Sequence, residues 1–137
     1  FLKNEESGEL AILDKVPGIH VIHLEKSYGF FTTLSESGKE EVRHMYGKVW
    51  SGIPEMVSGG AYDILVMDEF MAAYRYGLIP RDEAFAFLQE KPESLEVVLT
   101  GRDPDKRLVD LADYVSEIRK IKHPFDRGIL ARKGIEY

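Results

Sequence analysis

The sequence of 137 residues contains no cysteine. This absence excludes disulfides, thiolate nucleophiles and cysteine-ligated zinc from its chemistry. It fits a reducing compartment, and no signal peptide is visible, so we expect a cytoplasmic protein. No hydrophobic run approaches the roughly 18–20 residues that a membrane-spanning helix needs.

Basic residues are outnumbered, with 18 Lys and Arg against 24 Asp and Glu and a net charge of −6. General binders of nucleic acid or of anionic membranes need a basic surface, so this balance disfavours both classes. It still allows a local basic pocket for a phosphate ligand. One basic cluster near the C-terminus is typical of a solvated face, although it could also neutralise a polyphosphate; its members are Lys120, Lys122, Arg127, Arg132 and Lys133.

A phosphate-binding loop of the form G-x-x-x-x-G-K-[ST] is also missing. The nearest glycine pair, Gly59-Gly60, has no lysine beside it and precedes a predicted strand instead of following one. The chain begins Phe1-Leu2-Lys3, without methionine, and this start resembles the end of a strand. We therefore expect that the sequence lacks an upstream segment.

The patterns that are present alternate between strand and helix, which favours βαβ units and a mostly parallel sheet flanked by helices. We expect a single α/β domain over residues 1–137, because the length and the apolar content of 44% suffice for one core. Gly47, Gly52 and Pro54 are expected to bend or end the longest helix. Predicted strands cover 19–24, 62–67, 95–99 and 114–121; predicted helices cover 7–14, 35–56, 69–76, 80–89 and 103–111, the last with Asp103 as N-cap.

The most informative stretch is 64–69, in which four apolar residues run directly into Asp68 and Glu69. A continuous apolar run predicts a strand that is buried on both faces. Open α/β sheets bind ligands at the carboxyl ends of their strands, and there an acidic pair can hold Mg²⁺ beside a phosphate chain. The alternative is that one of the two acids only caps the next helix.

A second polar group, Thr100-Gly101-Arg102, follows the predicted strand 95–99. Parallel topology predicts that it lies beside Asp68 and Glu69. An arginine grips phosphate oxygens with its forked guanidinium, so acid and arginine together predict a nucleotide site. The alternative is an ordinary turn with a solvated arginine.

The loop that contains Phe30 and Phe31 is the other candidate for ligand contact. In an extended segment adjacent side chains point to opposite faces, so one of the two rings is expected on a ligand or interface side. Burial of both rings under a loop is the alternative. A lone histidine, His123, is expected to be structural rather than catalytic.

These residues together resemble the P-loop-type corrinoid adenosyltransferases, also called cob(I)alamin adenosyltransferases. The resemblance runs from Phe1 to Tyr137. It is most specific in the stretches 65–69, 98–102, 111–119 and 122–128, and it extends to the closing residues 133–137.

The resemblance implies a fold of the RecA-like P-loop NTPase type whose phosphate-loop segment lies ahead of Phe1. It implies transfer of the 5′-deoxyadenosyl group of ATP to the Co(I) of a corrinoid, with release of triphosphate, in adenosylcobalamin formation. It also implies Mg²⁺ or Mn²⁺ as cofactor, a homodimer and a flavoprotein reductase as electron donor.

Individual roles carry over by motif. Glu69 matches the family's Mg²⁺-binding acid, with Asp68 beside it, and Thr100, Gly101 and Arg102 match the nucleotide site, with Glu69 and Arg102 as the catalytic pair.

Phe30 matches an aromatic residue that contacts the corrinoid and excludes the lower axial ligand of cobalt. Some members carry a tryptophan two residues later, where this chain has Thr32, so Phe31 is expected to stand in for it.

Two other functions are compatible with these residues. A corrinoid- or nucleotide-binding module without catalysis would explain the missing phosphate loop. A RecA-like P-loop ATPase would release phosphate and ADP, where the transferase releases triphosphate.

Overall fold

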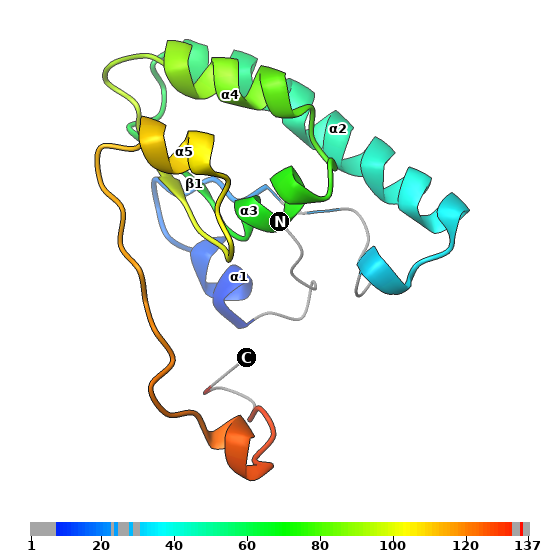
Figure 1. Ribbon diagram of the computed structural model, residues 1–137. Helices are drawn as coiled ribbons and strands as arrows, with labels where there is room; N and C mark the ends of the chain where they lie inside the picture. Colours follow the sequence, from blue (N-terminus) through cyan, green and yellow to red (C-terminus); the bar gives the residue numbers. More distant parts are fainter. Residues whose placement is uncertain (1–7, 23, 25–27, 29–30, 133–134, 136–137) are drawn as a thin grey trace.

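The computed structural model describes residues 8–22, 24, 28, 31–132 and 135. Within this part, a two-stranded parallel sheet is flanked by helices (Figure 1). The strands are β1 (Ile64–Met67) and β2 (Glu96–Leu99); the helices are α1 (Gly8–Leu13), α2 (Glu36–Ser58), α3 (Phe70–Arg75), α4 (Arg81–Glu90) and α5 (Lys106–Leu111), with 3-10 turns η1 (Phe31–Thr33) and η2 (Pro124–Arg127). None of the helices described has the length and hydrophobicity that crossing a membrane requires.

Strands β1 and β2 form the two sides of a βαβ unit in which α3 and α4 make the connection. The register places Met67 opposite Leu99, so the two carboxyl ends finish level with each other. The expected α/β class with a parallel sheet and flanking helices is confirmed.

Helix α2 is the longest element, and its first turn is capped by the Ser35 hydroxyl, which accepts a hydrogen bond from the Gly38 amide at 3.2 Å. Helix α2 continues through Gly47, Gly52 and Pro54 to Ser58, so none of these residues ends it, and the alternative that they bend it stays a prediction. The reason is tertiary: one stripe of α2 is buried along its length, and this burial outweighs the local cost of glycine and proline.

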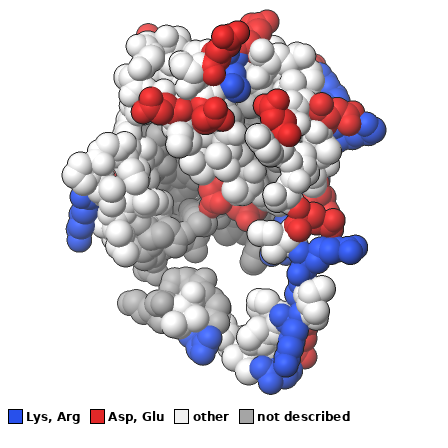
Figure 2. Space-filling view, turned by 90° about the vertical axis from the view of Figure 1, so that its left-hand side faces the viewer, with Lys and Arg blue, Asp and Glu red and all other residues white. Residues whose placement is uncertain are grey.

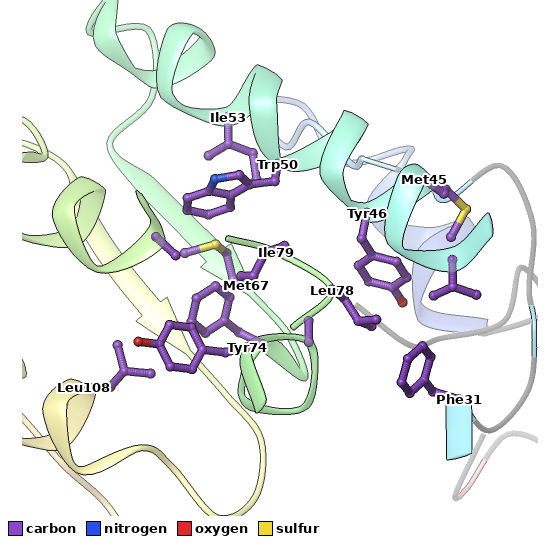
Figure 3. Packing of buried hydrophobic residues seen from close by; sticks show 14 residues of the cluster. Phe31, Met45, Tyr46, Trp50, Ile53, Met67, Tyr74, Leu78, Ile79 and Leu108 are labelled. Atoms are coloured by element: carbon purple, nitrogen blue, oxygen red, sulfur yellow. The ribbon is translucent and has the colours of Figure 1, made fainter. Parts of the chain in front are cut away.

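The core lies between α2 and the βαβ unit (Figure 3). The Trp50 ring of α2 meets the Phe87 ring of α4 edge to face, with centroids 5.6 Å apart, and lies 6.4 Å from the Phe70 ring of α3. Edge-to-face pairs of this kind add specificity to hydrophobic burial. The buried residues of the cluster are Phe31, Val42, Met45, Tyr46, Trp50, Ile53, Met67, Phe70, Ala73, Tyr74, Leu78, Ile79, Ala84 and Leu108.

Only one face of the sheet is buried in the part of the chain that the structure describes. Met67 is 2% exposed, whereas Ile64 and Val66 of β1 are 58% and 60% exposed and Val98 of β2 is 46% exposed. The prediction that β1 is buried on both faces is therefore wrong here. Side chains alternate along a strand, and the described helices cover the face that carries Met67.

Two predicted strands are also not formed. Of the segment 19–24, the residues described (19–22 and 24) have no strand structure, and residues 114–121 are likewise outside any strand. Tyr114, Ile118 and Ile121 are each more than 90% exposed, at 94%, 97% and 91%. A strand needs a neighbour for its backbone hydrogen bonds, and among the described residues β1 and β2 pair only with each other.

Candidate functional site at the strand ends

The candidate site lies where β1 and β2 end. The backbone N–H of Thr100 donates to the Met67 carbonyl at 3.2 Å, which continues the strand ladder by one more residue. Asp68 and Glu69 leave β1 at this point, and Thr100 leaves β2 beside them. The prediction that these two polar stretches meet at one edge of the sheet is confirmed for Asp68, Glu69 and Thr100.

The Thr100 hydroxyl connects the two strand ends. Its Oγ1 donates to Asp68 Oδ1 at 2.7 Å and accepts from the Glu69 backbone N–H at 2.9 Å. The bonds are part-buried, and Asp68 Oδ2 is buried as well. A carboxylate in a charge-assisted hydrogen bond of this length has a defined orientation.

Glu69 has an unusual backbone. Its φ of 54° and ψ of 26° place it in the left-handed helical region, which non-glycine residues rarely occupy. It is the N-cap residue of α3, but its side chain makes no capping hydrogen bond. The alternative that the Glu69 carboxylate serves to cap the helix is therefore wrong, and the carboxylate is available for another role.

Gly101 lies close against the start of α3. Its φ is 139°, and a Cβ built on it would lie 2.7 Å from Cβ of Met71. The Met71 N–H donates to the Thr100 carbonyl at 3.3 Å, which draws the start of α3 against the end of β2. Only glycine fits this backbone, because any side chain would collide with α3.

The loop that follows contains an exposed Arg102, whose side chain is open to solvent and to a ligand. The next residue, Asp103, was expected to cap the following helix, and this expectation is wrong. Asp103 has φ 51° and accepts a hydrogen bond from Arg75 Nη1 at 2.8 Å. Asp105 caps α5 instead, accepting from the Arg107 amide at 2.9 Å.

A small depression of about 160 Å³ adjoins this loop, and the sequence patterns do not predict it. Its lining residues are Met71, Tyr74, Arg75, Arg81, Asp103 and Asp105. Arg81 organises its wall, because the guanidinium donates to the Tyr74 carbonyl at 2.9 Å and also to the Arg75 carbonyl at the end of α3. The only sequence signal is a pair of arginines on either side of a helix C-terminus, where cations are favoured.

Burial raises the pKa of the Tyr74 phenol above its usual value near 10. Its hydroxyl is buried and has no hydrogen-bond partner among the described residues. Tyr74 therefore contributes apolar packing at the cost of one unsatisfied polar group.

The aromatic loop is described only in part. Phe30 lies outside the described residues. Phe31 is buried, with its ring 5.2 Å from the Tyr76 ring and the Arg43 guanidinium 5.6 Å above it. Phe31 is a packing residue in this arrangement, and corrinoid contact by either phenylalanine stays a prediction.

The C-terminal segment is separate from this edge of the sheet. His123 caps η2 with Nδ1, which accepts from the Phe125 N–H at 3.1 Å, in agreement with a structural role. Lys120 pairs with Asp126 at 2.7 Å. In Figure 2 basic side chains gather on the part of the chain below the body, while acidic side chains dominate the body.

Asp68 and Glu69 match the ligand chemistry of Mg²⁺. Magnesium sites that act on nucleotides use one or two carboxylates together with phosphate oxygens and water. No group of three or more metal-binding side chains exists within the described ranges, so these residues could contribute such a two-carboxylate site and no complete cage. The residues present fit a cation that arrives with a nucleotide.

Several known proteins are similar in sequence to this chain. The sequence model described as "ATP:corrinoid adenosyltransferase BtuR/CobO/CobP" matches residues 1–137. The corrinoid adenosyltransferase of Escherichia coli K12 is 36% identical over 90 residues, which cover 66% of this chain and 46% of that protein. The corrinoid adenosyltransferase of Sinorhizobium sp is 36% identical over 124 residues, and the match covers 83% of this chain and 58% of that protein.

A third relative is the corrinoid adenosyltransferase CobA of Salmonella typhimurium. It is 37% identical over 89 residues, which cover 65% of this chain and 45% of that protein. The chain thus spans about half the length of the curated relatives that it matches.

Proposed function

Because this chain belongs to the ATP:corrinoid adenosyltransferase family, we propose that the full-length protein transfers the 5′-deoxyadenosyl group of ATP to the cobalt of a reduced corrinoid. The Co(I) electron pair forms a bond to C5′, the C5′–O bond breaks, and triphosphate leaves with those bonding electrons. Cobalt supplies the nucleophile, so the protein has to orient the two substrates and stabilise the leaving group.

The observation that supports this proposal most strongly is the joined pair of strand ends. Asp68 and Glu69 lie at the carboxyl end of β1, and Thr100 holds them to the end of β2. Open α/β sheets bind ligands at this edge. A RecA-like P-loop arrangement over a single α/β domain extends this proposal, and it requires a phosphate-binding loop from sequence upstream of Phe1.

We assign the residues of this edge as follows. Glu69 and Asp68 hold Mg²⁺ or Mn²⁺, which when bound would neutralise charge on the triphosphate. Arg102, exposed in the loop that follows β2, binds phosphate oxygens. Gly101 shapes the nucleotide site by letting the end of β2 pack against α3. A homodimer, a flavoprotein reductase and a cytoplasmic location accompany the proposal as predictions.

The decisive experiment mixes the full-length protein with ATP, Mg²⁺ and chemically reduced cobalamin. The transferase produces a light-sensitive Co–C absorption change and stoichiometric triphosphate. Bound corrinoid without that change would identify a binding module, and formation of ADP and phosphate would identify an ATPase. Either result would overturn the proposal.

The corrinoid side is tested separately with Phe30→Ala. An aromatic residue that excludes the lower axial ligand eases reduction of Co(II), so this variant should lose more activity with Co(II) corrinoid plus reductant than with pre-reduced Co(I). Phe31→Ala should in addition lower the melting temperature, because Phe31 is packed in the core. Equal losses from Phe30→Ala with both corrinoids would limit Phe30 to binding.

A further inference from the structure

We propose that Thr100 is a positioning residue for the cation site, and that its hydroxyl acts through Asp68 and Glu69 instead of touching the nucleotide. This inference rests on the proposed function and refines the expectation that Thr100 binds nucleotide. The first reason is its location: Thr100 is the last residue that the β-ladder holds, so its side chain has a fixed backbone to project from.

The second reason is how the hydroxyl is used. A hydroxyl has one proton to donate, and Thr100 donates it to Asp68 Oδ1 at 2.7 Å. It also accepts from the Glu69 N–H at 2.9 Å. Both bonds are part-buried and run within the protein, so the proton of the hydroxyl is already committed when a nucleotide arrives.

The third reason is the conformation of Glu69. A left-handed backbone persists at a non-glycine residue only where its surroundings impose it. Here the N–H of Glu69 is bonded to Thr100, and the next turn is tied to the Thr100 carbonyl through the Met71 N–H at 3.3 Å. The Thr100 side chain and carbonyl together hold Glu69 in the geometry that frees its carboxylate from helix capping.

The test compares Thr100→Val with Thr100→Ser in the full-length protein. Valine keeps the shape of threonine but can make neither hydrogen bond, whereas serine can make both. We expect Thr100→Val to weaken Mn²⁺ binding in the presence of ATP by about tenfold, as loss of an outer-shell partner typically does. The electron paramagnetic resonance signal of free Mn²⁺ measures this binding. Thr100→Ser should stay within about twofold of wild type.

The rates of adenosyl transfer by the two Thr100 variants should differ in the same way as their Mn²⁺ affinities. Thr100→Val should need more Mg²⁺ for half-maximal rate and should lower kcat, with a smaller effect on KM for corrinoid. Ser51→Ala is the control, since it also removes one hydroxyl bond, from Ser51 to the Lys48 carbonyl in α2. A double variant with Asp68→Asn should show less than the product of the two single effects, because Thr100 acts through Asp68.

The outcomes distinguish failure of the proposed function from failure of the positioning role of Thr100. Wild-type protein without transferase activity refutes the proposed function. Active wild type with unchanged Mn²⁺ affinity in Thr100→Val refutes the positioning role, and so does a variant that loses thermal stability while its folded fraction binds Mn²⁺ normally. If Thr100→Val does not fold, Thr100→Ala, which adds no bulk, gives the same comparison.

Discussion

At the scale of single residues, the candidate site combines three side chains whose local environments differ. Asp68 is fixed by a hydroxyl, Glu69 is freed by an unusual backbone, and Arg102 is open to solvent. A binding edge needs such a division, because groups that hold a ligand must be presented while their supports are locked.

Glu69→Gln should lower kcat/KM for ATP by at least about tenfold, because it removes a charged ligand and even outer-shell changes cost that much. The melting temperature should stay close to wild type, since the side chain makes no capping bond in α3. Steady-state kinetics over a range of Mg²⁺ concentrations checks this expectation. Glu93→Gln, at an exposed loop position, is the control, and wild-type rates in Glu69→Gln would remove Glu69 from the site.

Tyr74→Phe should raise the free energy of unfolding by about 1 kcal/mol below pH 10, because it removes a buried hydroxyl that has no partner among the described residues. The pH dependence follows from the raised pKa of Tyr74, whose main cause is burial. Up to about pH 10 both states keep the proton. Above about pH 10 the Tyr74 phenol loses its proton in the unfolded state first. The free energy of unfolding of the wild type therefore falls with rising pH until the pH exceeds the higher pKa of the folded state.

Urea denaturation of Tyr74→Phe and wild type at several pH values from 7 to 11 measures both effects. The difference between the two proteins should grow with pH above about 10. A difference that is constant with pH would show that the Tyr74 phenol titrates alike in both states.

At the scale of elements, glycines in a helix and at a strand end have opposite roles. Gly52 lies exposed inside α2, and a Cβ there would meet nothing within 4 Å. Gly101 lies after β2 with φ 139°, and a Cβ there would meet Met71 at 2.7 Å. The same substitution therefore has opposite consequences at the two positions.

Gly52→Ala should stabilise the protein by about 0.5–1 kcal/mol, because alanine has the higher helix propensity. Gly101→Ala should destabilise it by about 1–3 kcal/mol, the usual cost of a strained backbone, before the collision with Met71 is added. Chemical denaturation of both variants provides the measurement. If Gly101→Ala left the free energy of unfolding unchanged, the end of β2 would have to move away from α3 without loss of stability.

At the scale of the whole molecule, the core and the site are chemically separate. The buried set among the described residues is hydrophobic and includes no polar or charged residue. The acids at the strand ends are only half-buried. Folding therefore depends on apolar burial, and the proposed cation site lies outside this core, at the edge of the sheet.

Removing divalent cations with EDTA should accordingly abolish adenosyl transfer by the full-length protein while its far-UV circular dichroism stays the same. Added Mg²⁺ should restore the rate. The melting temperature without nucleotide should change little on chelation, because no described core residue is a metal ligand. A large drop would show that a metal supports the fold itself.

Much of this organisation could be predicted from the sequence. The apolar run before Asp68 and Glu69 predicted β1 and the edge of the sheet, and the helix predicted over 35–56 corresponds to α2. The strands expected at 19–24 and 114–121 are not formed by the described residues. A strand forms only where a neighbouring strand accepts and donates its backbone hydrogen bonds, and the pattern of the segment itself does not supply that neighbour.

The amino-acid order by itself determined the α/β class, the acids and the arginine that follow the strands, and the family, because periodicity and motif spacing are local properties of the chain. Only the tertiary structure decided that Thr100 links Asp68 to Glu69, that Glu69 adopts a left-handed backbone, and that Asp103 pairs with Arg75. The residues in these hydrogen bonds are 31, 32 and 28 positions apart in the sequence. The sequence predicted that the two polar stretches lie at one edge of the sheet, but which of their atoms pair depends on strand register and loop conformation, which no local pattern specifies.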